Sequence, residues 1–230
     1  MSKPLRIPES EATGHPGLPQ RVEVRKFSPG PYQTNCYLVR VTGGEECWLV
    51  DLGFAPEGEL GEVEKMGLKP SRLLLTHAHV DHMAGVEAFR RRYPGVPVCL
   101  HRGERGFLEN PELNLSAFGS PISAGEADEW LEEGQELRMG EVVWKVLHVP
   151  GHSPGSVAFW CEGAGLVISG DALFAGSVGR TDFPTSDQDL LFSSIRKKLY
   201  TLPGETRVLP GHGPVTTVER ERKTNPFVRG

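Results

Sequence analysis

Hydrophobic and polar residues alternate along the first part of the chain in the manner of β-strands. Residues 21–27 and 34–41 follow this two-residue period, and the apolar run 47–50 comes after the glycine pair at 43–44. Successive side chains of a strand point to opposite faces, so alternation marks a strand with one buried face. The pattern predicts three antiparallel strands joined by tight connections.

The next segment changes its period and predicts helices alternating with strands. Apolar residues three or four apart indicate a helix over 56–67. A strand over 72–75, a helix over 85–93 and a strand over 96–100 follow it. This order predicts a β-α-β unit in which the loop after the first strand faces the edge of a sheet.

The second half of the chain reads as further strands and one longer helix. Prolines and glycines interrupt residues 101–137 repeatedly, which predicts a long irregular segment of the kind that often forms a functional flap. Together the elements predict two stacked mixed β-sheets with helices outside. The remaining strands are expected over 141–149, 157–161, 166–169 and 207–209, and the helix over 187–200.

Length and charge restrict what the protein can be. Of the 230 residues, we expect 21–230 to form a single domain and 1–20, which lack the apolar segment of a signal peptide, to form a mobile tail. No apolar run is long enough to cross a bilayer, so a cytoplasmic protein without a membrane partner is expected. The net charge of −5, without a Lys/Arg block, argues against nucleic acid as a partner. A monomer or homodimer is expected.

The four cysteines lie far apart in the sequence, and no two of them form a C-x-x-C pair. Most lie in apolar, strand-like runs, where a cysteine is usually a buried free thiol. We therefore expect neither disulfides nor a cysteine metal site. The cysteines are Cys36, Cys47, Cys99 and Cys161.

One loop concentrates the candidate chemistry. His77, His79, Asp81 and His82 lie within six residues, directly after the apolar run 73–75. Open α/β folds place their sites at the carboxyl ends of strands, and imidazole and carboxylate are ligands that zinc, iron and manganese prefer. The chain has eight histidines in all, so three of them in one loop favour a metal site over a surface loop.

Three other predicted strands also end on a possible ligand: His152, Asp171 and His212. A single His or Asp at such a position is more often a turn or capping residue. Here, however, the same layout recurs, with glycines beside each candidate. So many imidazoles and carboxylates would be costly to bury together without a cation, and this favours a shared metal centre.

These segments carry a family resemblance. Residues 76–82, 150–156, 170–174 and 210–214 resemble, in order, the motifs of the metallo-β-lactamase superfamily. The H-x-H-x-D-H loop is fairly specific by itself, and the full set in this order is highly specific. The resemblance extends over about residues 21–228. It implies an α/β fold, an αββα sandwich of two mixed β-sheets with flanking helices and a dinuclear metal site between the sheets.

The resemblance also implies roles for the candidate residues. Two divalent metal ions are expected, with zinc first and iron or manganese as alternatives. A bound metal lowers the pKa of water from about 15.7 toward ~7, which makes hydroxide available at neutral pH. Asp81 is expected to be catalytic as well, by orienting that hydroxide. The implied ligands are His77, His79 and His152 for the first metal, Asp81, His82 and His212 for the second, and Asp171 as the bridge.

The segment 177–183 bears on the substrate. It resembles the matching stretch of glyoxalase II relatives and of persulfide dioxygenases, and in glyoxalase II a basic residue at the position of Arg180 helps to hold the carboxylate of glutathione. An ion pair with Asp182 is the other interpretation of Arg180. The short end after His212 is similar to short, single-domain glyoxalase-II-like hydrolases. The expected function is hydrolysis of a small acyl-thioester of the hydroxyacylglutathione type. The alternative is a persulfide dioxygenase with one iron.

Three further polar residues are expected to stay outside the metal-binding set. Asp51 ends a strand and should hydrogen-bond backbone or a ligand imidazole. His148 precedes His152 by four residues, so a contact between them is open. His101 is expected at the surface.

Overall fold

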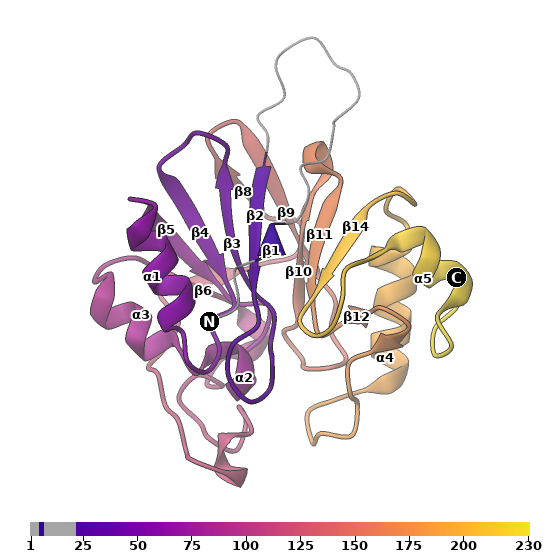
Figure 1. Ribbon diagram of the computed structural model, residues 1–230. Coiled ribbons are helices and arrows are strands. Elements are labelled where there is room, and N and C mark those ends of the chain that lie inside the picture. The colour runs from indigo at the N-terminus through magenta and orange to yellow at the C-terminus, as the bar shows by residue number, and fades with distance from the viewer. Residues whose placement is uncertain (1–4, 7–21) are drawn as a thin grey trace.

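The computed structural model describes residues 5–6 and 22–230. Its two larger β-sheets lie face to face (Figure 1). In the first sheet β1 to β4 are antiparallel neighbours, and β4 to β7 are parallel ones. The strands, in spatial order, are β1 (Leu5–Arg6), β2 (Val22–Phe27), β3 (Cys36–Val41), β4 (Glu46–Val50), β5 (Lys69–Leu74), β6 (Val98–His101) and β7 (Glu129–Leu131).

The second sheet is also mixed, because one parallel pair lies among antiparallel ones. A separate two-stranded hairpin, β12 (Leu173–Phe174) with β13 (Ser177–Val178), lies between two of its strands in the chain, after residue 170 and before residue 207. The strands of the second sheet, in spatial order, are β15 (Thr216–Thr217), β14 (Arg207–Pro210), β11 (Leu166–Gly170), β10 (Val157–Cys161), β9 (Val142–His148) and β8 (Glu136–Met139).

Helices cover the outer faces of both sheets (Figure 1). The first sheet carries α1 (Glu57–Lys65) and α3 (Val86–Arg92). The second carries α4 (Gln188–Ser194), which continues as a π-helical segment over 195–199, and α5 (Val218–Thr224). The αββα sandwich of mixed sheets is thereby confirmed. In the part of the chain that is described, no helix combines the length and the apolar character that crossing a membrane requires.

Strand β4 shows how alternation builds the layers. Trp48 and Val50 point into the core between the sheets, whereas Cys47 and Leu49 point toward the helices. Trp48 meets Trp144 of the second sheet with ring centroids 6.3 Å apart. All four cysteines are buried and free, as the sequence predicts.

The expectation of an irregular flap over 101–137 is wrong in part. This stretch contains all of β7 and the start of β8, and Phe107 and Leu108 are buried in the core under the helices of the first sheet. Strands of three or four residues are too short to show a clear period, which explains the miss. Helix α5 was not anticipated either. The tail proposed for residues 1–20 lies outside the described residues, except for β1, which pairs with β2.

Glu59 gives the fold a pH dependence. It is fully buried in the first turn of α1 and forms no ion pair with any described residue. Burial raises the pKa of Glu59 from 4.5 to about 7. The folded chain thus holds this proton more tightly than the unfolded chain, and stability should fall as pH rises from 4.5 to about 7. The loss should level off near 3 kcal/mol, roughly.

The variant Glu59→Gln resembles the protonated acid at every pH. Urea unfolding of metal-free protein should show it more stable than the parent by about 3 kcal/mol at pH 8, with little difference at pH 4. Parallel pH profiles for the two proteins would contradict this.

Candidate metal centre

Seven side chains meet at one edge of the sandwich, where several strands end. They come from the turn after β5, from the short helix α2 (Val80–Met83), and from the loops after β9, β11 and β14. In each of three groups, one ligand atom per residue lies within 4.8 Å of the others. We call the seven residues the His/Asp cluster. The groups are His77, His79 and His152; His77, His82 and Asp171; and Asp81, His82 and His212.

The first group consists of three buried imidazoles. His79 Nδ1 and His152 Nε2 lie 2.9 Å apart. His152 Nδ1 donates to the carbonyl of Arg180 at 2.8 Å, and His77 Nδ1 lies 3.1 Å from Thr76 Oγ1. These outer contacts fix the ring orientations. They leave His77 Nε2 and His152 Nε2 directed into the cluster, which is how an imidazole is prepared for a metal.

The other two groups combine imidazoles with carboxylates. His82 Nε2 lies 3.3 Å from Asp171 Oδ1 and 3.5 Å from Asp81 Oδ2. His212 Nε2 lies 3.1 Å from the same Asp81 oxygen and 3.5 Å from Asp171 Oδ2. Asp171 also approaches His152 Nε2 at 3.7 Å, so it lies close to imidazoles of all three groups. This central place is the one a bridging carboxylate needs.

Asp51 lies outside the His/Asp cluster and hydrogen-bonds residues of the loop that carries four of its members. Its carboxylate accepts hydrogen bonds from Thr76 N at 2.7 Å and from Thr76 Oγ1 at 2.8 Å, and it faces His82 Nδ1 at 2.8 Å. The expectation that Asp51 bonds backbone and a candidate imidazole is confirmed. It orients His82 so that Nε2 points into the cluster.

Close packing around Asp171 requires a glycine. A Cβ atom at Gly211 would lie 2.0 Å from Asp171 Oδ1, well inside the contact limit. Any side chain at this position would displace either the carboxylate or the loop that carries His212. The glycine beside this histidine thus has a steric function.

Electrostatics divide the histidines into two sets. Burial, together with the neighbouring imidazoles, lowers the pKa of His77 far below its usual value and that of His79 to about 3, so both are neutral. Burial acts in the same direction on His82, but the Asp81 and Asp171 carboxylates outweigh it and raise the pKa of His82. Without a metal, a proton on His82 compensates these carboxylates, and a cation would replace it.

The cluster fits divalent cations. His77 Nε2, His82 Nε2 and Asp171 Oδ1 are buried and have no hydrogen-bond partner among the described residues. Each such atom costs about 1–3 kcal/mol when left unpaired. Neutral imidazole and ionised carboxylate suit zinc and iron, so cations would satisfy all three atoms at once.

The comparison with known families agrees with this geometry. A profile described as the metallo-beta-lactamase superfamily matches residues 29–212, a range that includes the whole His/Asp cluster. The chain belongs to the metallo-β-lactamase superfamily. Members of this superfamily include metal-dependent hydrolases, and the match supports this class of enzyme.

Two curated relatives of this superfamily match nearly end to end. "Probable metallo-hydrolase YqgX" of Bacillus subtilis is 40% identical over 208 residues, covering 90% of this chain and 97% of the relative. "Hydroxyacylglutathione hydrolase GloC" of Haemophilus influenzae is 34% identical over 200 residues, covering 86% and 93%.

Solved structures of the superfamily agree as well. The B3 metallo-beta-lactamase BLEG-1 matches with a TM-score of 0.85 and 40% identity, over 90% of this chain and 100% of its own. TTHA1623, solved in a di-iron-bound form, matches with a TM-score of 0.79 and 44% identity, over 88% and 99%.

In this superfamily member, a buried carboxylate ties two ligand-bearing loops together. Glu104 Oε2 accepts from Ala78 N at 3.1 Å, between His77 and His79. Its Oε1 accepts from Ser153 Oγ at 2.6 Å and from Gly155 N at 2.7 Å, in the loop of His152. Burial raises the pKa of Glu104, and these three donors act against that effect. The sequence reading missed Glu104.

Arg180 lies next to the His/Asp cluster, where its backbone carbonyl contacts His152. Its guanidinium forms a two-point ion pair with Asp182, at 2.9 and 2.7 Å, and sits 4.6 Å from the ring centre of Phe183. Its side chain is 68% exposed. The ion pair expected as one interpretation is present, and substrate binding by Arg180 stays a prediction. Its backbone carbonyl already orients His152.

His101 and His148, the other two histidines among the described residues, pair with each other. His101 is half-buried, and not simply at the surface as expected, because its ring stacks on His148 with centroids 4.0 Å apart. His148 Nε2 donates to the carbonyl of Pro154 at 2.9 Å. His148 therefore stabilises the loop of His152 through a backbone carbonyl and does not contact His152 itself by a hydrogen bond.

Proposed function

We propose that this protein is a metal-dependent hydrolase of small acyl-thioesters of the hydroxyacylglutathione type. The observation that carries the proposal is the convergence of seven side chains, among which His77 Nε2, His82 Nε2 and Asp171 Oδ1 are buried without a hydrogen-bond partner among the described residues. The similarity to GloC over almost its whole length supports the thioester as the substrate class.

In this proposal the His/Asp cluster holds two divalent cations, zinc or iron. The similarity to a structure solved in a di-iron-bound form supports two metals per chain. Bound cations would supply an activated water at neutral pH and stabilise negative charge on a carbonyl oxygen. His77, His79 and His152 would hold one cation, Asp81, His82 and His212 the other, with Asp171 between them.

The chain's own residues position the reactants. Asp81 Oδ2 accepts a hydrogen bond from Thr34 Oγ1 at 2.9 Å and faces His212, so its carboxylate is fixed where it can orient an attacking water. Hydrolysis forms a C–O bond, breaks the C–S bond and releases an acid and a thiol. A cysteine nucleophile is disfavoured, because burial raises the pKa of Cys47 and Cys99 to about 12 and that of Cys161 to about 11.

The test is hydrolysis of S-D-lactoylglutathione by protein reconstituted with zinc and, separately, with iron. We expect rapid loss of the thioester, two metals per chain by elemental analysis, and no activity in chelator-treated protein. A metal-loaded rate equal to that of the metal-free control would overturn the proposal.

Two further assays separate the other activities. Oxygen uptake with glutathione persulfide, at one iron per chain, would assign a persulfide dioxygenase. If the protein hydrolyses a chromogenic cephalosporin faster than the thioester, its activity is β-lactam hydrolysis, the activity in the name of BLEG-1.

A further inference from the structure

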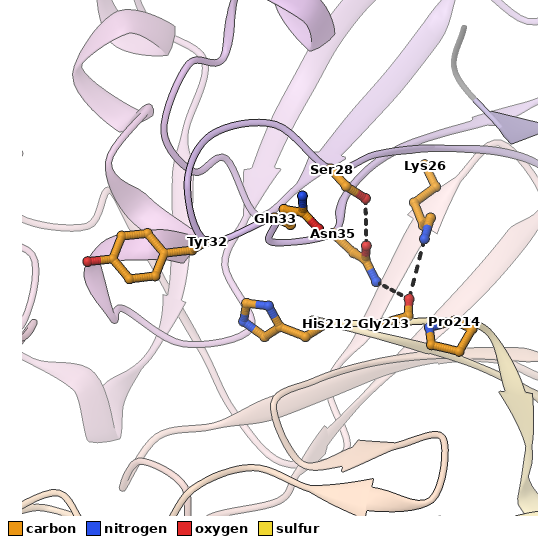
Figure 2. A pocket seen from close by; sticks show the side chains of 8 residues that line it. All are labelled: Lys26, Ser28, Tyr32, Gln33, Asn35, His212, Gly213 and Pro214. Carbon is orange, nitrogen blue, oxygen red and sulfur yellow. Dashed lines mark hydrogen bonds between the residues drawn. The ribbon is translucent and has the colours of Figure 1, made fainter. Parts of the chain in front are cut away.

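A cavity of about 410 Å³ opens beside the His/Asp cluster, and His212 belongs to its wall. This volume lies in the range of small-molecule sites. In Figure 2 the imidazole of His212 lies between the ring of Tyr32 and the side of the pocket formed by Asn35, with Lys26 beyond Gly213. The cavity is lined by Lys26, Ser28, Tyr32, Gln33, Asn35, His212, Gly213 and Pro214.

The floor of this cavity is fixed by Asn35. Its Nδ2 donates to the Gly213 carbonyl at 2.9 Å, and its Oδ1 accepts from Ser28 Oγ at 2.7 Å (Figure 2). The same Nδ2 donates to the Pro210 carbonyl at 2.9 Å. Its backbone N–H donates to the Gly211 carbonyl at 2.7 Å. The loop before β3 is therefore tied to the loop that carries His212, and the wall is formed before a ligand arrives.

An aromatic side chain forms another wall. Tyr32 is 58% exposed, and its ring stacks on Phe54 with centroids 5.6 Å apart. Gly30, at φ +70°, turns the chain close against Phe54. The exposed ring is thus held in place and offers an apolar surface to whatever occupies the cavity.

Lys26 supplies the charge. The residue is half-buried, its ammonium donates to the Gly213 carbonyl at 3.3 Å, and among the described residues it contacts no carboxylate. One carbonyl oxygen leaves its other N–H donors available. Burial lowers the pKa of Lys26, and a bound anion would offset that cost. Arg180, which does not line this cavity, is already paired with Asp182.

We propose that this cavity binds a carboxylate on the non-reacting part of the substrate, with Lys26 as its cationic partner. The inference rests on the proposed function and narrows it to anionic thioesters. In a protein of net charge −5, such a local cation offsets the repulsion of an anionic substrate.

The experiment compares three thioesters. S-D-lactoylglutathione carries carboxylates on the thiol side, the succinyl thioester of N-acetylcysteamine carries one on the acyl side, and the acetyl thioester of N-acetylcysteamine is neutral. In Lys26→Gln, KM should rise about tenfold for at least one of the charged substrates, with kcat nearly unchanged and the neutral substrate unaffected. The charged substrate that responds identifies which side occupies the cavity.

Two variants serve as controls. Lys26→Arg should keep the parental KM. Lys69→Gln makes the same change in net charge at the far end of β5, on an exposed lysine paired with Glu45, and should leave all three substrates unaffected. Equal responses of charged and neutral substrates to Lys26→Gln, or the same response in Lys69→Gln, would overturn the inference.

Calorimetry with S-methylglutathione, an unreactive thioether, separates the two proposals. Binding to the parent that weakens about tenfold in Lys26→Gln supports the cavity even if no thioester is cleaved, in which case only the hydrolase assignment fails. Binding that Lys26→Gln does not change, or no binding at all, overturns the cavity assignment when KM for the succinyl thioester is also unchanged in Lys26→Gln.

Discussion

Replacing Asp171 by Asn is expected to lower thioester hydrolysis by at least about 10³-fold and to reduce the metal content of the protein. Among the described carboxylates, Asp171 approaches imidazoles of all three groups, at 3.3 Å from His82, 3.5 Å from His212 and 3.7 Å from His152. Asparagine keeps the shape and loses the charge. Charge stabilisation by metals is worth several kcal/mol in a transition state, which sets the size of the effect.

The measurements are kcat/KM and metals per chain by elemental analysis after dialysis. Asp182→Asn is the matched control, because it removes an exposed carboxylate only eleven positions away and should leave the metal content unchanged. A fully active Asp171→Asn protein with two metals would show that this carboxylate does not bridge the cations.

The convergence of the His/Asp cluster could be anticipated because its members follow directly on strands. Alternating or apolar runs mark the strands, and a polar residue after each run must lie at a sheet edge. The same reasoning found Asp51, whose hydrogen bonds are confirmed. The sandwich could also be anticipated from the sequence, because its strands and helices were predicted from their apolar patterns and together indicate two stacked sheets with helices outside.

Other parts of the site could not be read in this way. Glu104 follows β6 as the candidate ligands follow their strands, yet its partners Ala78 and Gly155 lie 26 and 51 positions away. Asn35 reaches Pro210 across 175 positions. A sequence pattern reports which face of an element is apolar, and it does not report which distant backbone donor meets a polar side chain. The edge strands β7 and β8 were missed because three or four residues barely establish a period.

Glu104→Gln is expected to weaken binding of the first cation about 10–100-fold and to destabilise the fold by about 1–3 kcal/mol. Glu104 uses both oxygens as acceptors, one for Ala78 N and the other for Ser153 Oγ and Gly155 N. Glutamine has a single acceptor, and its NH₂ group would face a backbone N–H in either orientation. One of the two ligand-bearing loops would then lose its anchor.

The effect should fall on the group formed by His77, His79 and His152, because Glu104 contacts Ala78 N, between His77 and His79, and Ser153 and Gly155 in the loop of His152. Chelator competition, followed well below the unfolding temperature, should show one cation released more readily while the other is retained. Glu104→Ala should be more severe, since three buried donors lose their acceptor. Glu109→Gln changes an exposed carboxylate five positions on and should behave as the parent. Parental metal affinity in Glu104→Gln, with only the stability lowered, would show that this carboxylate supports the fold without positioning the metal-binding loops.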